Sequence, residues 1–190
     1  MGQGLRRKVN ANVATGGAGI WRWTQGSVGL GIQKGGEMSI AGILRGHEFF
    51  HNLGLEEVKA VSGFSERLHY SRNDQVFTYA QKADKVYLLL KGAVLLRFPP
   101  GKADTQMIIA RIEKGELFGI SPLLGAEVYG VEALCTEDAE VLGIKAGELQ
   151  GVLKEDCMAG FVIMSEVAKA YLDRYRGLLR DLQGVVSSLS

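Results

Sequence analysis

Short strand-like segments separated by turn residues run through the middle of the chain, and they constrain its fold more than any other feature. Their apolar residues tend to alternate with polar ones, which is typical of half-buried strands. Turn-forming residues lie between them at Asn73-Asp74, at Lys91-Gly92 and in the run Pro99–Lys102. Many short strands with evenly placed turns are typical of a closed or double-sheet jelly roll. The strands are expected at residues 69–71, 75–79, 85–90, 93–98 and 105–112.

Helical spacing replaces this alternation on both sides of the strand region. Apolar residues from Ile40 to Phe50 and again from Leu55 to Phe64 lie three or four positions apart, which predicts two short helices. After Gly151 the pattern is helical to the end of the chain. Alternating three- and four-residue steps predict a seam for another helix. The seam consists of Met164, Val167, Tyr171, Tyr175, Leu178, Leu182 and Val185.

The first 37 residues differ in composition from the rest. They hold ten of the 26 glycines, and five basic residues against one acidic residue. Such a segment buries too little apolar surface to offset its ordering entropy, so we expect a flexible tail. Two alternatives stay open: a basic arm that stacks Trp21 and Trp23 on nucleic acid bases, or sequence upstream of a true start at Met38. The expected organisation is therefore a tail over 1–37, a β-roll with its leading helices over 38–153, and a C-terminal helix over 154–190.

Three stretches of the chain resemble the cyclic nucleotide-binding domain of the catabolite-activator and Crp/Fnr regulators. Residues 115–135 read GELFGISPLLGAEVYGVEALC, and the corresponding family frame is approximately G-E-L-F-G-E-x-A-L-L-x-G-x-x-R-x-A. Residues 83–94, ADKVYLLLKGAV, are similar to the family's central hairpin, and residues 137–144 are similar to its last strands. The resemblance implies a mainly β fold: a double-stranded β-helix or jelly-roll β-roll with flanking helices and a long C-terminal helix.

The 115–135 stretch resembles the phosphate-binding cassette of that family, but it departs from the pattern at two positions. Ile120 stands where the family has a glutamate for the ribose hydroxyl, and Tyr129 stands where it has an arginine for the cyclic phosphate. A tyrosine hydroxyl is one neutral donor, whereas arginine offers paired, charge-assisted bonds. Loss of that contact costs about 1.5–3 kcal/mol of binding free energy. Ser121-Pro122 is predicted to cap and begin a short helix whose amides face a ligand oxygen.

The resemblance places any ligand against one set of cassette residues and gives the last helix a role in dimerisation. The expected pocket residues are Gly115, Glu116, Leu117, Phe118, Gly119, Ile120, Ser121, Tyr129, Gly130 and Val131. In catabolite activators the matching helix forms the dimer interface, so a homodimer through the predicted seam is expected here. Packing of that seam on its own barrel is the alternative. An unidentified protein partner is a further expectation.

We therefore expect a stand-alone regulatory or sensor module with weak or no binding of cyclic AMP or cyclic GMP, and no other cofactor. One alternative is a working cyclic nucleotide receptor that uses backbone amides and Tyr129. The other is a haem or redox sensor, with His47, His51 and His69 as candidate ligands and Cys135 and Cys157 as candidate thiols. The histidines lie in no metal-binding pattern, and a buried thiol is usually inert.

Several classes of function are disfavoured by the sequence. No nucleophile elbow or P-loop is present, and Glu116 is expected to serve the turn of the cassette, so the module is expected to be non-catalytic. The net charge of +1 gives no electrostatic case for nucleic acid or membrane, and no apolar run is long enough to span a bilayer. We expect no DNA-binding domain, metal site or secretory signal in these 190 residues. A cytoplasmic protein is the prediction.

Overall fold

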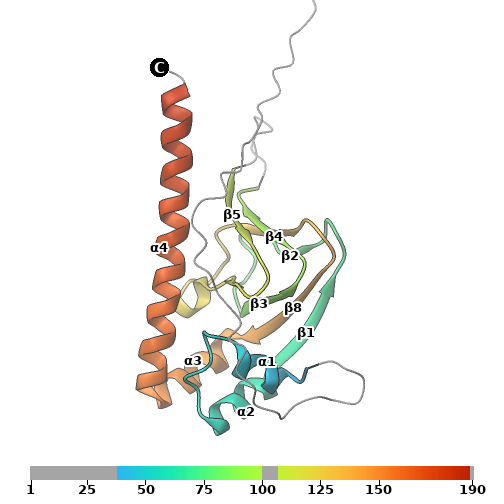
Figure 1. Cartoon of the computed structure of the whole chain (residues 1–190), viewed down its shortest axis with the longest axis vertical. Coiled ribbons are helices and arrows are strands. Elements are labelled where there is room, and N and C mark those ends of the chain that lie inside the picture. The colour runs from blue at the N-terminus through green and yellow to red at the C-terminus, as the bar shows by residue number, and fades with distance from the viewer. Residues whose placement is uncertain (1–37, 100–106, 189–190) are drawn as a thin grey trace, which may run out of the picture.

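The computed structural model describes residues 38–99 and 107–188. The expectations for residues 1–37, for 100–102, 105–106 and 189–190, and for the side chain of Val185 lie outside what it describes. Two four-stranded antiparallel sheets form the body of the domain, and helices flank them (Figure 1). The predicted β-roll with flanking helices and a long C-terminal helix is confirmed.

The helices and strands follow one another in this order: α1 (Ile40–Gly46), α2 (Leu55–Gly63), β1 (Ser65–Tyr70), β2 (Gln75–Phe77), β3 (Lys85–Lys91), β4 (Val94–Arg97), β5 (Ile108–Ile112), β6 (Leu117–Phe118), the 3₁₀ turn η1 (Ser121–Leu124), β7 (Glu132–Cys135), β8 (Ala139–Lys145), α3 (Ala146–Glu155) and α4 (Cys157–Ser188). One sheet has the strand order β1-β8-β3-β6 and the other β2-β7-β4-β5. Chain-distant strands are therefore neighbours, as a jelly roll requires.

Most predicted elements appear close to their expected positions. The first strand begins earlier than expected, at Ser65, and Asn73 takes the left-handed conformation expected of its turn, with φ of 75°. Helix α3 starts at Ala146, inside the segment that the sequence assigned to the β-roll. A separate helix, α4, then begins at Cys157, where the Asp156 carboxylate accepts hydrogen bonds from the amides of Met158 and Ala159.

Two apolar cores lie on opposite sides of the β1-β8-β3-β6 sheet, because its strands alternate their side chains. We call them the barrel core and the helix-side core. Along β3, Tyr87 and Leu89 pack in the barrel core, whereas Val86 and Leu88 pack in the helix-side core. The helix-side core takes in residues of α1, α2, α3 and the first part of α4.

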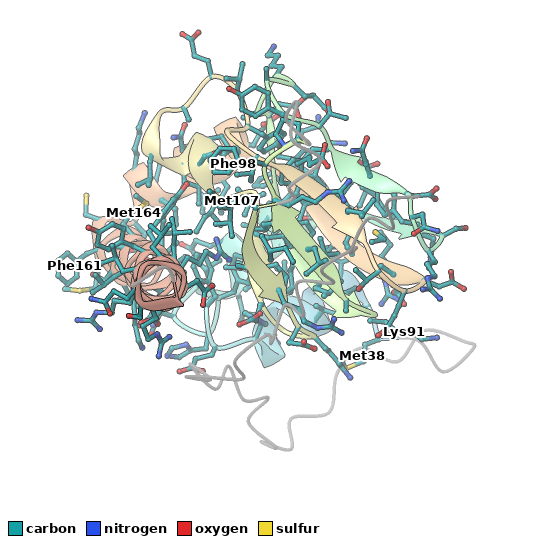
Figure 2. All side chains as sticks on the ribbon, turned by 90° about the horizontal axis from the view of Figure 1, so that it is seen from above. Met38, Lys91, Phe98, Met107, Phe161 and Met164 are labelled. Carbon is teal, nitrogen blue, oxygen red and sulfur yellow. The ribbon has the colours of Figure 1, made fainter. Side chains whose placement is uncertain are left out.

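Helix α4 stands alongside the β-roll, and its C-terminal end extends past the strands (Figure 1). Seen along α4, Phe161 points away from the β-roll (Figure 2), and its side chain is 71% exposed. In the part of the chain that the structure describes, no helix is both long and apolar enough to cross a membrane.

Candidate ligand pocket and its cassette

The cassette, residues 115–131, follows β5 in the chain, passes through β6 and η1, and ends where β7 begins. Gly119 lies between β6 and η1 with φ of +60°, a conformation that favours glycine. A Cβ atom there would lie 2.9 Å from Tyr87 Cδ2 and 3.0 Å from Phe77 Cε1. Glycine at this position therefore lets the backbone approach the aromatic rings of the barrel.

Tyr129 fills the barrel beneath this turn. Its side chain is only 2% exposed, and its ring stacks on Phe77 with centroids 3.9 Å apart and planes 18° apart. The hydroxyl donates to the Lys85 carbonyl at 2.7 Å and accepts from the Lys85 amide at 3.3 Å. The residue that stands in place of the family's arginine is thus a fully engaged part of the barrel core.

Three more aromatic rings complete this cluster around Tyr129. Phe77, Tyr87 and Phe118 stack on one another with centroid separations of 5.3–6.1 Å. Burial raises the pKa of Tyr129 and of Tyr87, so both phenols are neutral at physiological pH. The arrangement is apolar and uncharged, which suits neutral aromatic surface and opposes an anion.

The main chain of Tyr129 is also fixed, by the loop between β2 and β3. Its amide donates to the Gln81 carbonyl at 2.9 Å, and its carbonyl accepts from the Ala80 amide at 2.9 Å. Ala80 has φ of 61°, which is unusual for a residue with a Cβ. The loop and the cassette therefore hold each other, with Tyr129 at their junction.

Ile120 does not face this aromatic cluster. It is 2% exposed and packs in the helix-side core. Ile120 and Tyr129, both expected as pocket residues, therefore pack in different cores, because the cassette divides its side chains between the two. Leu117 likewise packs in the helix-side core, and Phe118 packs in the barrel core.

The expected cap of the short helix is also wrong. The residue before η1 is Ile120, Ser121 lies inside the turn, and no side chain caps it. A four-residue 3₁₀ turn presents no helical dipole of consequence to a ligand. The remaining pocket residues vary in burial: Gly115 is buried, Ser121 and Val131 are half-buried, and Gly130 is exposed.

Glu116 serves the turn at the start of the cassette. Its carboxylate accepts a hydrogen bond from the Glu113 amide at 2.7 Å. Burial raises the pKa of Glu116, and Arg174 opposes that shift through its charge. The acid thus has a structural role, as the sequence predicted.

Three helices each donate a side-chain N–H to a main-chain carbonyl of the cassette. From the end of α1, His47 Nε2 donates to Gly115 O at 2.7 Å. From α3, Gln150 Nε2 donates to Pro122 O at 3.1 Å and to Leu123 O at 3.3 Å. From α4, Arg174 donates to Leu117 O. The cassette is therefore tied to the helices by polar contacts as well as by apolar packing.

These helical donors were not predicted as cassette contacts from the sequence, and only one of them left a signal there. Arg174 lies on the stripe that continues Ile163, Val167 and Ala170, so a cation occupies a position where the helix spacing expects an apolar residue. Gln150 is an ordinary polar residue that lies half-buried in α3. The hydrogen bond of His47 joins residues 68 positions apart.

The predicted seam residues of α4 divide between two environments. Val167 is fully buried in the helix-side core, so it is unavailable to a partner helix. Met164 and Leu178 are half-buried, whereas Tyr171, Tyr175 and Leu182 are 38%, 58% and 45% exposed. The exposed stripe shares Tyr175 and Leu182 with the predicted seam, and its other members are Phe161, Ala168, Leu172 and Leu179.

The candidate haem and redox residues differ in their surroundings. His47 is buried with both ring nitrogens engaged, because Nδ1 accepts from the Phe49 amide at 3.1 Å while Nε2 donates to Gly115. His51 is exposed in the loop after α1, and His69 lies in β1. Burial raises the pKa of the Cys135 thiol to about 11, which keeps it protonated, and Cys157 lies at the exposed start of α4.

Residues 67–156 match the model of the cyclic nucleotide-binding domain. This stretch of the chain belongs to the cyclic nucleotide-binding domain family. The matched residues run from β1 to the residue after α3 and include the whole cassette. No protein of curated function matches the chain.

Solved structures share the fold of this cyclic nucleotide-binding domain. A Geobacter metallireducens protein described as cyclic nucleotide-binding is 28% identical, with a TM-score of 0.61, over 70% of this chain and 96% of its own. The Thermus thermophilus catabolite activator protein is 24% identical, with a TM-score of 0.57, over 72% of this chain and 62% of its own. The regulatory domain of Toxoplasma gondii PKA, solved with cAMP, is 13% identical, with a TM-score of 0.59, over 70% of this chain and 48% of its own.

Proposed function

We propose that this chain is a non-catalytic regulatory module whose cyclic nucleotide-binding domain binds cyclic AMP and cyclic GMP weakly or not at all. One observation carries the proposal: the ring of Tyr129 is buried in the barrel core, and its hydroxyl is hydrogen-bonded to Lys85, the first residue of β3. A side chain that belongs to the protein occupies space which a ligand would need. No cation takes the place of the family's arginine at this position.

The cost of moving Tyr129 out supports weak binding. A tyrosine side chain buries about 150–250 Å², so exposing it costs on the order of 4 kcal/mol. Each hydrogen bond lost to Lys85 adds about 1 kcal/mol. A ligand that must first displace the ring therefore loses at least about a thousandfold in affinity.

The output of the module in this proposal is the position of α4. That helix packs on the helix-side core and contacts the cassette directly through Arg174. A change in the cassette would therefore be transmitted to α4. We further propose that the exposed stripe of α4 joins two copies of the chain, with an unidentified protein partner as the recipient of the signal.

Calorimetric titration with cyclic AMP and cyclic GMP tests the proposal. The unchanged protein should give no saturable heat up to millimolar nucleotide. Submillimolar binding would instead support the alternative, a working receptor that uses backbone amides and Tyr129. A Tyr79→Phe variant is the matched control, since Tyr79 is 51% exposed and lies outside the cassette.

The same titration on a Tyr129→Arg variant tests the reason for the weak binding. That change removes the Tyr129 ring from the barrel core and restores the family's cation. It should therefore create measurable affinity for the nucleotides if the rest of the cassette keeps its structure. Circular dichroism must first show that the variant is folded. A folded Tyr129→Arg variant that still gives no saturable heat with either nucleotide would show that the Tyr129 side chain is not what prevents binding.

A further inference from the structure

The base of α4 is anchored by close apolar packing. Ala159, Ile163 and Val167 are buried in the helix-side core. A Cβ atom on Gly160 would lie 2.4 Å from the Leu153 carbonyl oxygen, so α3 and α4 meet there at backbone distance. This part of the helix cannot move without opening the core.

The rest of α4, residues 171–188, we call the arm, and it is attached differently. Among the residues that the structure describes, Ala170 is the last of α4 to pack on either core. A Cβ atom on Gly177 would meet nothing within 4 Å, although α4 passes beside β5. Leu172 and Leu179 on the arm are 45% and 40% exposed.

The arm makes polar contacts to one short piece of the cassette. Arg174 donates to the carbonyl of Leu117 in β6, which is an edge strand of its sheet. The Arg174 charge also acts on the carboxylate of Glu116 and opposes the rise of its pKa that burial causes. The two cassette residues concerned, Glu116 and Leu117, are neighbours in the chain.

We propose that Arg174 is a latch that docks the arm on the cassette, so that the arm can be released while the base of α4 stays packed. The latch is a positioning device that joins the cassette to the arm. The inference rests on the proposed function only in treating α4 as the output of the module. It assigns the coupling between the cassette and α4 to one hydrogen bond, which the Arg174 side chain donates to the Leu117 carbonyl in the edge strand β6.

The chemistry of the contact suits a reversible joint. A charge-assisted hydrogen bond to a carbonyl is strong enough to hold a helix segment that has little apolar contact of its own. It can also break without exposing a large apolar surface, so release does not require unfolding of the domain. An apolar side chain at this position would lack both the bond and the specificity of its geometry.

Hydrogen exchange measured by mass spectrometry on the full chain tests the latch. All proteins in the comparison carry Leu172→Glu and Leu179→Glu, so that association through the exposed stripe cannot protect the arm. Arg174→Met removes the guanidinium and keeps much of the side-chain volume. Arg176→Met is the matched control, because it makes the same change two residues away at an exposed position. Arg174→Lys retains a cation that can reach one carbonyl.

In Arg174→Met, the amides of residues 174–184 should exchange at least about tenfold faster, while those of 157–170 keep their protection. Arg176→Met should leave both segments unchanged, and Arg174→Lys should restore part of the protection. Equal exchange of the arm in Arg174→Met and Arg176→Met would overturn the latch. Loss of protection in base and arm together would overturn it as well, because the arm would then have no separate motion.

Failure of the latch and failure of the proposed function give different results. Submillimolar binding of a cyclic nucleotide to the unchanged protein would refute the proposed function and leave the latch standing. An arm that exchanges at the fast rate even with Arg174 in place would refute the latch alone.

Discussion

Tyr129 illustrates how one side chain can decide the character of a site. Removing only its hydroxyl, in Tyr129→Phe, keeps the stack on Phe77 and leaves two polar groups of Lys85 without that partner. The unfolding free energy should fall by about 1–2 kcal/mol. Tyr129→Ala also removes the ring and should cost about 3–5 kcal/mol. Urea denaturation measures both, with the exposed Tyr79→Phe as a control within about 0.5 kcal/mol of the unchanged protein. A cost below about 1 kcal/mol for Tyr129→Ala would contradict the burial described above.

His47 should make the stability of the domain depend on pH. Burial lowers the pKa of His47, and its bond to Gly115 and the charge of Glu48 oppose that shift without reversing it. The unfolded chain therefore binds a proton near the ordinary histidine pKa of about 6.5, while the folded domain does not. The contribution of His47 to the unfolding free energy is therefore fully present above that pH. It falls as the pH drops toward the lowered pKa of the folded state, by at most about 1.4 kcal/mol per pH unit.

The measurement is the unfolding free energy between pH 7.5 and 5.5 for the unchanged protein, His47→Gln and the exposed-residue control His51→Gln. The slope should be shallower in His47→Gln alone. Glu116 acts in the opposite direction, because burial raises its pKa and its contribution is lost as the pH rises from about 4.3. The difference between variants isolates His47 from Glu116. Identical slopes in all three proteins would show that His47 is not held neutral.

At the scale of the secondary-structure elements, two glycines of α4 should respond in opposite ways to the same substitution. Gly177→Ala places a methyl group in open space and removes the flexibility of glycine, so it should stabilise the domain by roughly 0.5–1 kcal/mol. Gly160→Ala drives a methyl group against the backbone of Leu153 and should destabilise it. Urea denaturation of the pair measures the sign. Stabilisation by both changes would show that α3 and α4 are less tightly packed than described.

For the whole molecule, association should depend on the exposed stripe of α4. An unpartnered apolar stripe with three- and four-residue spacing favours a second helix. We expect a dimer at tens of micromolar by analytical ultracentrifugation. The pair Leu172→Glu and Leu179→Glu should convert it to a monomer, because four carboxylates would then face one another in the interface. Arg176→Met, also exposed on α4, is the control. A monomeric unchanged protein at that concentration would remove the dimer from the proposed function.

The sequence by itself determined the fold class, because turn residues and alternation locate the strands and three motif-like stretches name the family. It also located the two departures from the family pattern in the cassette, since Ile120 and Tyr129 can be compared directly with the family frame. Only the tertiary structure decided what those residues do. Tyr129 packs in the barrel core and Ile120 in the helix-side core, because the cassette contributes side chains to both cores. The tertiary structure likewise decided which apolar residues of α4 stay exposed and which carbonyl Arg174 contacts. Helical spacing marks every apolar face, but only packing shows which face the protein has already covered.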